Sequence, residues 1–166
     1  MIFVALSIKI TSKGPIIFWS DRVGQDRKIF QMPKYRTMQE NAPLLPTHEL
    51  VHYNEFLTPI GKFLRKTSLD ETPQLFSILL GHMSFVGPRP ALFSQNDLIE
   101  LRDKNGIFSI KPGLTGLAQI NGRDNLSIEQ KVHYDTLYLS RMTFFNDIKI
   151  IFATFLKVIL GKNITH

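Results

Sequence analysis

The sequence predicts an α+β fold in a single, mostly helical domain over residues 1–166, with a small β-hairpin near its start. A chain of 166 residues is long enough for one domain with a substantial core. Strand-forming residues gather near the N-terminus on either side of a turn. Later segments are longer, and they carry helix-starting residues and apolar residues at helical spacing.

The hairpin is predicted over Lys9–Phe30. The residues Ile16–Trp19 are β-branched or aromatic and favour a strand, while Gly24–Arg27 supply a turn before the next apolar pair. Just beyond this segment, Lys34 and Arg36 alternate, so on a strand both would point to the same face. Two cations on one face can neutralise a pyrophosphate, although charges on a strand edge also serve solubility.

Composition limits the classes of function. The formal charge is +6 and the chain has no cysteine, which excludes disulfides and thiolate metal sites. A basic chain suits anionic lipids, phosphorylated substrates or nucleic acid. Because the positive residues are interleaved with acids and no RNA-binding or zinc-finger spacing is present, we expect no nucleic-acid partner. The apolar opening stops at Lys9 and is shorter than the roughly 20 residues that cross a bilayer.

The stretch from Arg65 to Pro90 holds the most specific chemistry. Two adjacent acids, Asp70 and Glu71, stand directly before Thr72-Pro73, a common pair at the start of a helix, and Gly81 suits the position after its end. A helix N-terminus favours anions and phosphates. Arginines at 65 and 89 flank the acids, and together these groups predict a phosphate-handling site.

A purely structural interpretation of the same acids is also open. Ser68 and Glu71 fit a capping box, which would leave Asp70 an ordinary acid of the first turn. Pro73 argues against that alternative, because it would fall at the fifth helical position and remove a backbone hydrogen bond.

The second half of the chain predicts helices joined by a compact loop. Residues 92–105 are amphipathic, residues 112–122 contain closely spaced glycines that form a loop, and Ser127 begins a further helix with Gln130 at the capping position. Arg123 can reach a phosphate or pair with Asp124. The last element is predicted at 144–160 with an apolar stripe, which either closes the core or contacts a membrane. The stripe comprises Phe145, Ile148, Phe152, Phe155, Leu156 and Ile159.

The segments SLDETPQLFSILLGHMSFVGPRP and KPGLTGLAQINGRD closely resemble the bacterial sugar transferase family, the monotopic phosphoglycosyl transferases. The match runs from about Lys9 to Leu160, with several blocks in the family's order. The resemblance implies a membrane-associated fold whose N-terminal helix re-enters the membrane, and this chain begins near the end of that helix. A second departure is His82, where relatives most often carry an acid; we favour a structural role for that position.

The resemblance also implies an activity. The enzymes of this family transfer a sugar phosphate from a UDP-sugar to a polyprenyl phosphate, such as undecaprenyl phosphate, at the cytoplasmic face of the inner membrane. We therefore expect a monotopic or peripheral enzyme that needs Mg²⁺ and works in capsule, O-antigen or glycan biosynthesis. A truncated, non-catalytic relative that binds the membrane surface is the alternative. The sequence leaves the sugar and the oligomeric state open, a homo-oligomer included.

The residue roles follow from the same resemblance. Asp70 would be the nucleophile, and Glu71 would share the metal or manage a proton. Substrate-binding roles fall to positions that match basic or acidic family motifs, and for Asp135 a structural salt bridge is an equal alternative. These positions are Arg65, Arg89, Lys34, Arg36, Arg123 and Asp135.

Overall fold

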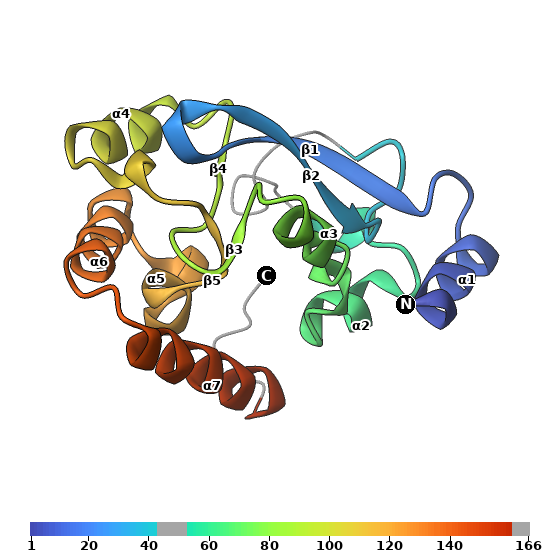
Figure 1. Ribbon diagram of the computed structural model, residues 1–166. Helices are drawn as coiled ribbons and strands as arrows, with labels where there is room; N and C mark the ends of the chain where they lie inside the picture. The colour runs from blue at the N-terminus through green and yellow to red at the C-terminus, as the bar shows by residue number, and fades with distance from the viewer. Residues whose placement is uncertain (43–52, 161–166) are drawn as a thin grey trace.

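The computed structural model describes residues 1–42 and 53–160, and Figure 1 shows their arrangement. Seven helices and two small sheets make up this part of the chain, which confirms the α+β class. The sequence of residues 39–57 favours a loop or short helix, and His48 and His52 within it lie outside the described residues.

A twisted antiparallel hairpin runs across one side of the molecule (Figure 1). Its strands are β1 (Ile17–Val23) and β2 (Ile29–Tyr35), in a register that pairs Ile17 with Tyr35 and Val23 with Ile29. The short strand β4 (Ala91–Leu92) joins the other edge of β1. The hairpin therefore delivers the C-terminal end of β2, with Lys34, to the region below it.

The helices fall into two groups on either side of the chain's centre, as Figure 1 shows. The first group is α1 (Ile2–Thr11), α2 (Gly61–Lys66) and α3 (Gln74–Leu79). The second group is α4 (Asn96–Lys104), α5 (Leu117–Asn121), α6 (Ile128–Ser140) and α7 (Phe144–Leu160). Between them lies a parallel pair of strands, β3 (Ser84–Val86) and β5 (Gly113–Thr115).

Three predictions about local structure were wrong. The hairpin does not start at Lys9, because the apolar residues before it form α1, whose Ile8 packs against Tyr35 and Leu64. Residues 112–122 are not a plain loop, since they contain β5 and α5. The predicted helix cap at Thr72 is absent. The hydroxyl of Thr72 instead donates to the carbonyl of Leu69 at 2.8 Å, and α3 begins after Pro73.

The alternative capping box is absent as well. Ser68 has a left-handed backbone (φ 54°) and makes no capping bond, and the two acids lie in a separate 3₁₀ turn, Leu69–Glu71. The sharp turn at Ser68 sets this segment apart from both neighbouring helices. Other boundaries were confirmed: Gly81 follows α3 at φ +79°, and Ser127 and Gln130 form the capping box of α6.

The core consists of three clusters that tie the groups together. One cluster joins α1 to β2 and α2 through Ile8, Tyr35 and Leu64. Another joins the hairpin to α4 and α6, and the third joins α7 to α6 and β3 through Ile150, Tyr138 and Val86. The described side chains of the predicted apolar stripe of α7 are exposed, and Ile150, outside the stripe, packs into the core.

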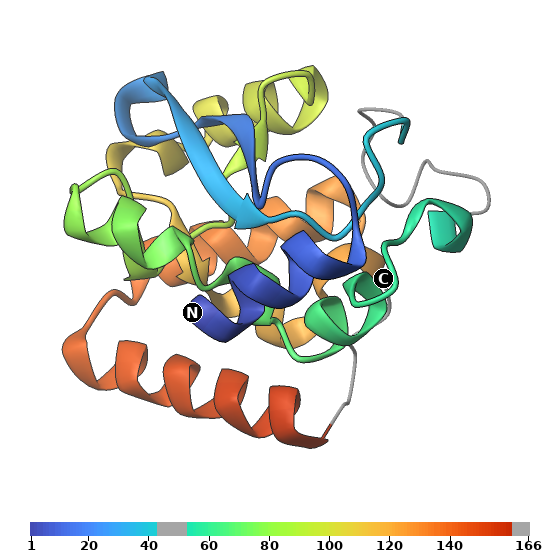
Figure 2. The same ribbon diagram turned by 90° about the vertical axis from the view of Figure 1, so that its right-hand side faces the viewer.

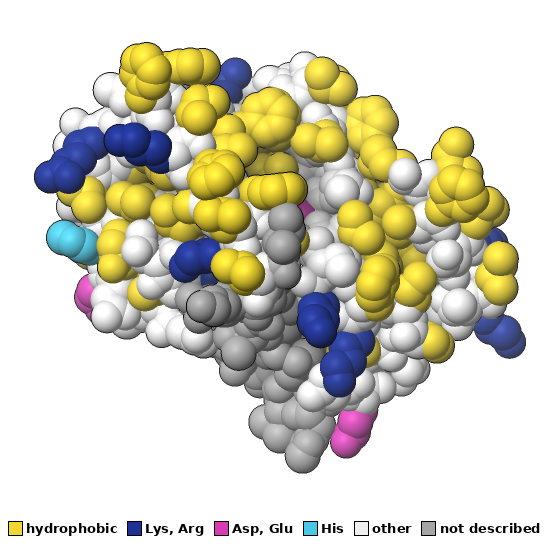
Figure 3. Space-filling model, turned by 90° about the horizontal axis from the view of Figure 1, so that it is seen from below, with side chains coloured by type: hydrophobic (Ala, Val, Ile, Leu, Met, Phe, Trp, Pro, Cys, Tyr) yellow, Lys and Arg dark blue, Asp and Glu magenta, His cyan; other side chains and the backbone are white. Residues whose placement is uncertain are grey.

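Hydrophobic side chains gather on the side of the molecule opposite the hairpin, where α7, α2 and α1 lie (Figure 3). Figure 2 shows the same side edge-on, with α7 along it. Exposed apolar residues come from all three helices and from α3, among them Phe3 at 86%, Phe63 at 56%, Leu79 at 82% and Phe145 at 77% of full exposure. We call this surface the apolar face. Among the described residues, no helix combines the length and hydropathy needed to cross a bilayer.

The close approach of β5 to the turn after β3 leads to a test of the fold. A Cβ at Gly113 would overlap the backbone nitrogen of Gly87 and the carbonyl oxygen of Thr115. We expect Gly113→Ala to lower the free energy of unfolding by about 1–3 kcal/mol, measured by denaturant titration. Lys104→Ala at the exposed end of α4 is the control, and equal stability of the two variants would contradict the packing described.

Candidate active site

Three basic side chains converge on one carboxylate oxygen. Oε1 of Glu71 is 2.6 Å from Nη2 of Arg89, 3.1 Å from Nζ of Lys34 and 3.3 Å from Nη2 of Arg123. Lys34 comes from β2, Arg89 from the turn after β3 and Arg123 from the 3₁₀ turn after α5. Burial alone would raise the pKa of Glu71, but the three cations hold it well below its usual range. Glu71 is therefore ionised throughout the physiological range.

Asp70, its neighbour in the chain, has a different environment. Within the part of the chain that the structure describes, its carboxylate makes no side-chain hydrogen bond or ion pair, although Lys34, Arg65 and Arg123 lie close enough to act on it electrostatically. Burial and the adjacent Glu71 together raise the pKa of Asp70 against the effect of these cations. One acid thus anchors the cations, while the other stays available and more basic than usual.

Lys34 is a buried cation whose charge depends on pH near neutrality. Burial lowers its pKa to about 8, although Glu71 acts in the opposite direction. The positive charges of Arg89 and Arg22 add to the lowering. At neutral pH, Lys34 is still protonated and completes the ring of positive charge around the two acids.

The structure separates Lys34 from Arg36, which the alternation along the strand had placed together. Arg36 lies beyond the end of β2, where its guanidinium donates to the carbonyls of Ser12 and Lys13 and ties the end of α1 to the hairpin. Arg65 lies nearer the acids, and its Nε donates to Oγ1 of Thr37 at 3.0 Å. Arg65 thus contributes charge next to Asp70, whereas Arg36 contributes an anchor for α1.

Asp135 forms a buried ion pair with Arg102, which agrees with the structural alternative given for Asp135, although the sequence did not identify Arg102 as the partner. Its Oδ2 accepts from Nη2 and Nε of Arg102 at 2.7 and 3.0 Å, and both residues are almost fully buried. Arg102 also donates to the backbone carbonyl of Arg89. No local signal marks Arg102, because its partner lies 33 residues away on another helix.

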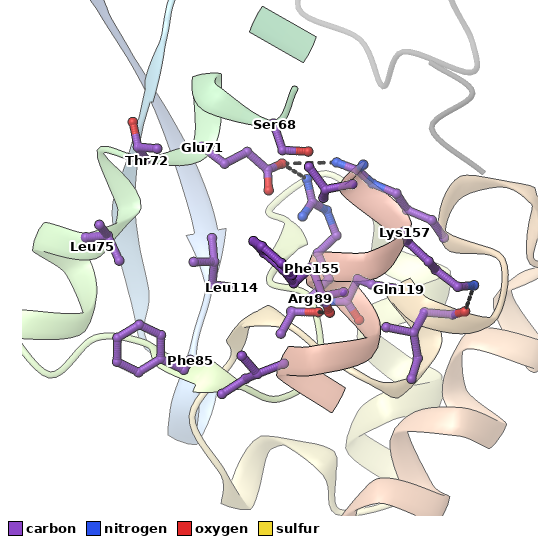
Figure 4. A pocket seen from close by; sticks show the side chains of 16 residues that line it. Ser68, Glu71, Thr72, Leu75, Phe85, Arg89, Leu114, Gln119, Phe155 and Lys157 are labelled. Carbon is purple, nitrogen blue, oxygen red and sulfur yellow. Dashed lines mark hydrogen bonds and ion pairs between the residues drawn. The ribbon is translucent and has the colours of Figure 1, made fainter. Parts of the chain in front are cut away.

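A pocket of about 450 Å³ opens beside the charged cluster (Figure 4). Glu71, Arg89 and Arg123 line it together with Ser68, and its remaining walls are mostly apolar side chains of α3, α5, α7 and the two parallel strands. These walls include Leu75, Phe85, Leu114, Ile120, Ile151, Phe155 and Val158. Asp70 is not among the lining residues, but it is the chain neighbour of Glu71, which lines the pocket, and it is 7% exposed. The pocket therefore suits a molecule with a phosphate at one end and an apolar remainder.

Two further residues lie outside the charged cluster. His82 is exposed, with its ring 5.8 Å from that of Phe30, and it does not line the pocket. Lys157 on α7 lines the pocket's far wall and donates to the carbonyl of Ile120.

Comparison with known proteins agrees with this geometry. A sequence model of the bacterial sugar transferase family matches residues 1–161. The chain belongs to this family. The match covers every helix and strand described above, so the cluster and the pocket both lie within the family's shared domain.

Named relatives add detail to the family assignment. The chain is 41% identical over 175 residues to a UDP-glucose:undecaprenyl-phosphate glucose-1-phosphate transferase of Klebsiella pneumoniae, an alignment that covers 98% of this chain and 37% of that protein. It is 36% identical over 178 residues to an undecaprenyl-phosphate galactose phosphotransferase of Salmonella typhimurium, covering 98% and 37%. The uncharacterized sugar transferase EpsL of Bacillus subtilis is 36% identical over 168 residues, covering 99% and 80%. The chain thus spans little more than a third of the length of the first two relatives.

The raised pKa of Asp70 predicts that this acid lowers the stability of the fold. A group whose pKa is higher in the folded state binds its proton more tightly there, so stability rises as the pH falls through that pKa. We expect Asp70→Asn to raise the melting temperature at pH 7 by about 2–4 °C, the shift that about 1 kcal/mol produces in a chain of this size. This gain in melting temperature should become smaller at acidic pH, where Asp70 of the wild type is itself protonated.

Thermal denaturation of Asp70→Asn and wild type across pH 4 to 7 measures the effect. Asp103→Asn, which removes an exposed acid paired with Arg27, is the matched control. A destabilised Asp70→Asn variant at pH 7 would contradict the charge balance described for the two acids.

Proposed function

We propose that this chain transfers a sugar 1-phosphate from a UDP-sugar to undecaprenyl phosphate, or a related polyprenyl phosphate, through a covalent aspartyl intermediate. The observation that carries the proposal is the pocket whose one end is a cluster of cations and whose walls are apolar. A lipid phosphate has that combination of charged head and hydrocarbon tail. The names of the relatives support both the nucleotide-sugar donor and the undecaprenyl-phosphate acceptor.

In the first step, a carboxylate oxygen of Asp70 attacks the β-phosphorus of the UDP-sugar. The bond from that phosphorus to the bridging oxygen breaks, and UMP leaves with the electron pair. In the second step, a phosphate oxygen of the lipid attacks the same phosphorus, releases Asp70 and gives a polyprenyl diphosphosugar. An acyl phosphate is reactive enough to pass the group on, and the raised pKa of Asp70 makes its anion the better nucleophile.

Glu71 serves this reaction by holding cations in place. Arg89, Arg123 and Lys34 all contact its Oε1, so their charges are fixed before substrate arrives. Fixed charges stabilise a developing anion without reorganisation at the moment of reaction. Arginine is suited to the task because it is planar, always charged and able to bind a phosphate through two bonds.

The carboxylates of the site fit one mode of magnesium binding, in which the protein supplies few of the ligands. Within the described residues, no group of three or more potential ligands is assembled for a metal. Mg²⁺ often binds through one or two carboxylates and completes its shell with water and substrate phosphates. Asp70 has the available carboxylate for that mode, whereas Oε1 of Glu71 already faces three cations. A bound Mg²⁺ would offset the negative charge on the leaving phosphate.

The apolar face supports a location of the reaction at a membrane surface. Exposed apolar residues of α1, α2, α3 and α7 lie on it, and α3 and α7 also contribute walls of the pocket. Lying against the cytoplasmic leaflet of the inner membrane, this face would let a lipid tail stay in hydrocarbon while its phosphate reaches the charged cluster. The product would enter a surface polysaccharide or glycan pathway.

Replacement of the nucleophile provides the central test. We expect Asp70→Asn to abolish UMP release from UDP-sugars, with a loss of at least about 10³-fold, because no acyl phosphate can form. The wild-type chain incubated with a UDP-sugar labelled in its β-phosphate should retain the label until polyprenyl phosphate is added. The measurements are UMP formation with detergent-solubilised lipid acceptor and label bound to denatured protein.

The outcomes separate the alternatives. Full turnover by Asp70→Asn would exclude Asp70 as the nucleophile, and no UMP release by the wild type with any of a panel of UDP-sugars would favour the non-catalytic membrane-binding alternative. Asp97→Asn, at the start of α4, is the matched control and should leave the rate unchanged.

The pKa of Lys34 predicts an alkaline limit. Since this pKa is about 8, the ammonium loses its charge above that pH and can no longer attract the donor's diphosphate. We expect the KM for the UDP-sugar to rise about fivefold between pH 8 and pH 9 while the fold persists. Lys34→Arg, which stays charged, should flatten the profile, and an identical rise in this variant would exclude Lys34 as the cause.

A further inference from the structure

The turn that carries Arg89 has its backbone held by two other arginines. Nη1 of Arg102 donates to the carbonyl oxygen of Arg89 at 2.7 Å, and Nη1 of Arg22 donates to the carbonyl oxygen of Pro90 at 3.1 Å. The prolines on both sides of Arg89 have no backbone N–H, so their backbones can bond to the surroundings only through their carbonyls. Two successive carbonyls are thus each fixed by a guanidinium from a different element.

Each of these guanidiniums is itself held. Arg102 on α4 makes two bonds to Asp135 on α6, and Arg22 on β1 donates through Nε to Oγ of Ser20 at 2.8 Å. Arg102 is 3% exposed and Asp135 is 2% exposed. The hairpin therefore holds one side of the turn, and the pair of helices α4 and α6 holds the other.

The start of the turn is fixed by β5. The N–H of Gly113 donates to the carbonyl of Pro88 and the N–H of Gly87 donates to the carbonyl of Thr115, both at 2.9 Å. Each residue from Gly87 to Pro90 thus has a backbone hydrogen bond to β5, to Arg102 on α4 or to Arg22 on β1. The side chain of Arg89 consequently leaves from a backbone of fixed position, and its guanidinium meets Glu71 at 2.6 Å.

We propose that Arg102 and Arg22 are positioning residues, which set the guanidinium of Arg89 against Glu71 and against the donor's phosphate without touching substrate. This inference rests on the proposed function. Neither side chain lines the described pocket. A buried ion pair such as Arg102–Asp135 is often no more stabilising than apolar residues of the same size, so a role in placing Arg89 accounts better for its presence.

A double-mutant cycle with UMP as the probe tests the proposal. The variant Arg102→Met with Asp135→Asn removes both buried charges together, so that neither is left unpaired. We expect it to bind UMP about tenfold more weakly than wild type and to bind uridine unchanged, because only the phosphate contact is misplaced. In an Arg89→Met background the same pair of changes should cost no further UMP affinity.

Isothermal titration calorimetry on the full chain in detergent gives these affinities. Equal losses for UMP and uridine, or the same UMP loss in the Arg89→Met background, would overturn the proposal in favour of a general structural role. Wild-type chain that does not bind UMP at all would overturn the proposed function, and this inference with it. Wild-type binding with unaffected variants would overturn the positioning role alone.

A second variant keeps the test decisive should the buried replacement fail to fold. Arg22 is only half-buried on β1, and Arg22→Met should weaken UMP binding in the same way, again with no further effect in the Arg89→Met background. Arg27→Met is the matched control, because it removes a guanidinium from the same hairpin whose partner, Asp103, is exposed. UMP affinity in Arg22→Met equal to that of this control would contradict the role of Arg22.

Discussion

One carboxylate oxygen organises the site. Oε1 of Glu71 gathers Lys34, Arg89 and Arg123, whose positions in the chain are separated by tens of residues. Like charges this close would repel one another if a buried anion were not between them. The hairpin, the turn after β3 and the segment after α5 are therefore brought together around a single negative charge, and the arrangement is in place before any substrate binds.

The adjacent acids Glu71 and Asp70 differ in their partners and in the direction of their pKa shifts. Glu71 is neutralised by its partners and has a lowered pKa, while Asp70 is left without a direct partner in the described part of the chain and has a raised pKa. Burying an acid in this way costs stability, which the rest of the fold must offset. In the proposed reaction, this loss of stability is the consequence of holding a reactive carboxylate next to fixed positive charge.

The apolar face and the pocket have the same physical origin. Helix α7 turns Ile150 toward the core and leaves Phe145, Ile148 and Phe152 outside, while Ile151 and Phe155 border the pocket. A helix that buries only one narrow side keeps an apolar surface for another partner. The charged cluster thus lies at one end of an apolar cavity whose walls continue into an apolar surface, an arrangement that suits the proposed lipid phosphate.

By itself, the sequence determined the α+β class, the bounds of α7 and the capping box of α6, because local capping and apolar periodicity are encoded within short segments. Motif spacing and the family resemblance singled out Asp70, Glu71, Arg89 and Arg123, whose roles stay predictions. Only the tertiary structure decided which cations reach which acid. Arg36 binds the end of α1 rather than Glu71, and Asp135 pairs with Arg102. The tertiary structure also placed the two acids in a separate 3₁₀ turn. These outcomes depend on contacts between residues far apart in the chain, for which local pattern carries no signal.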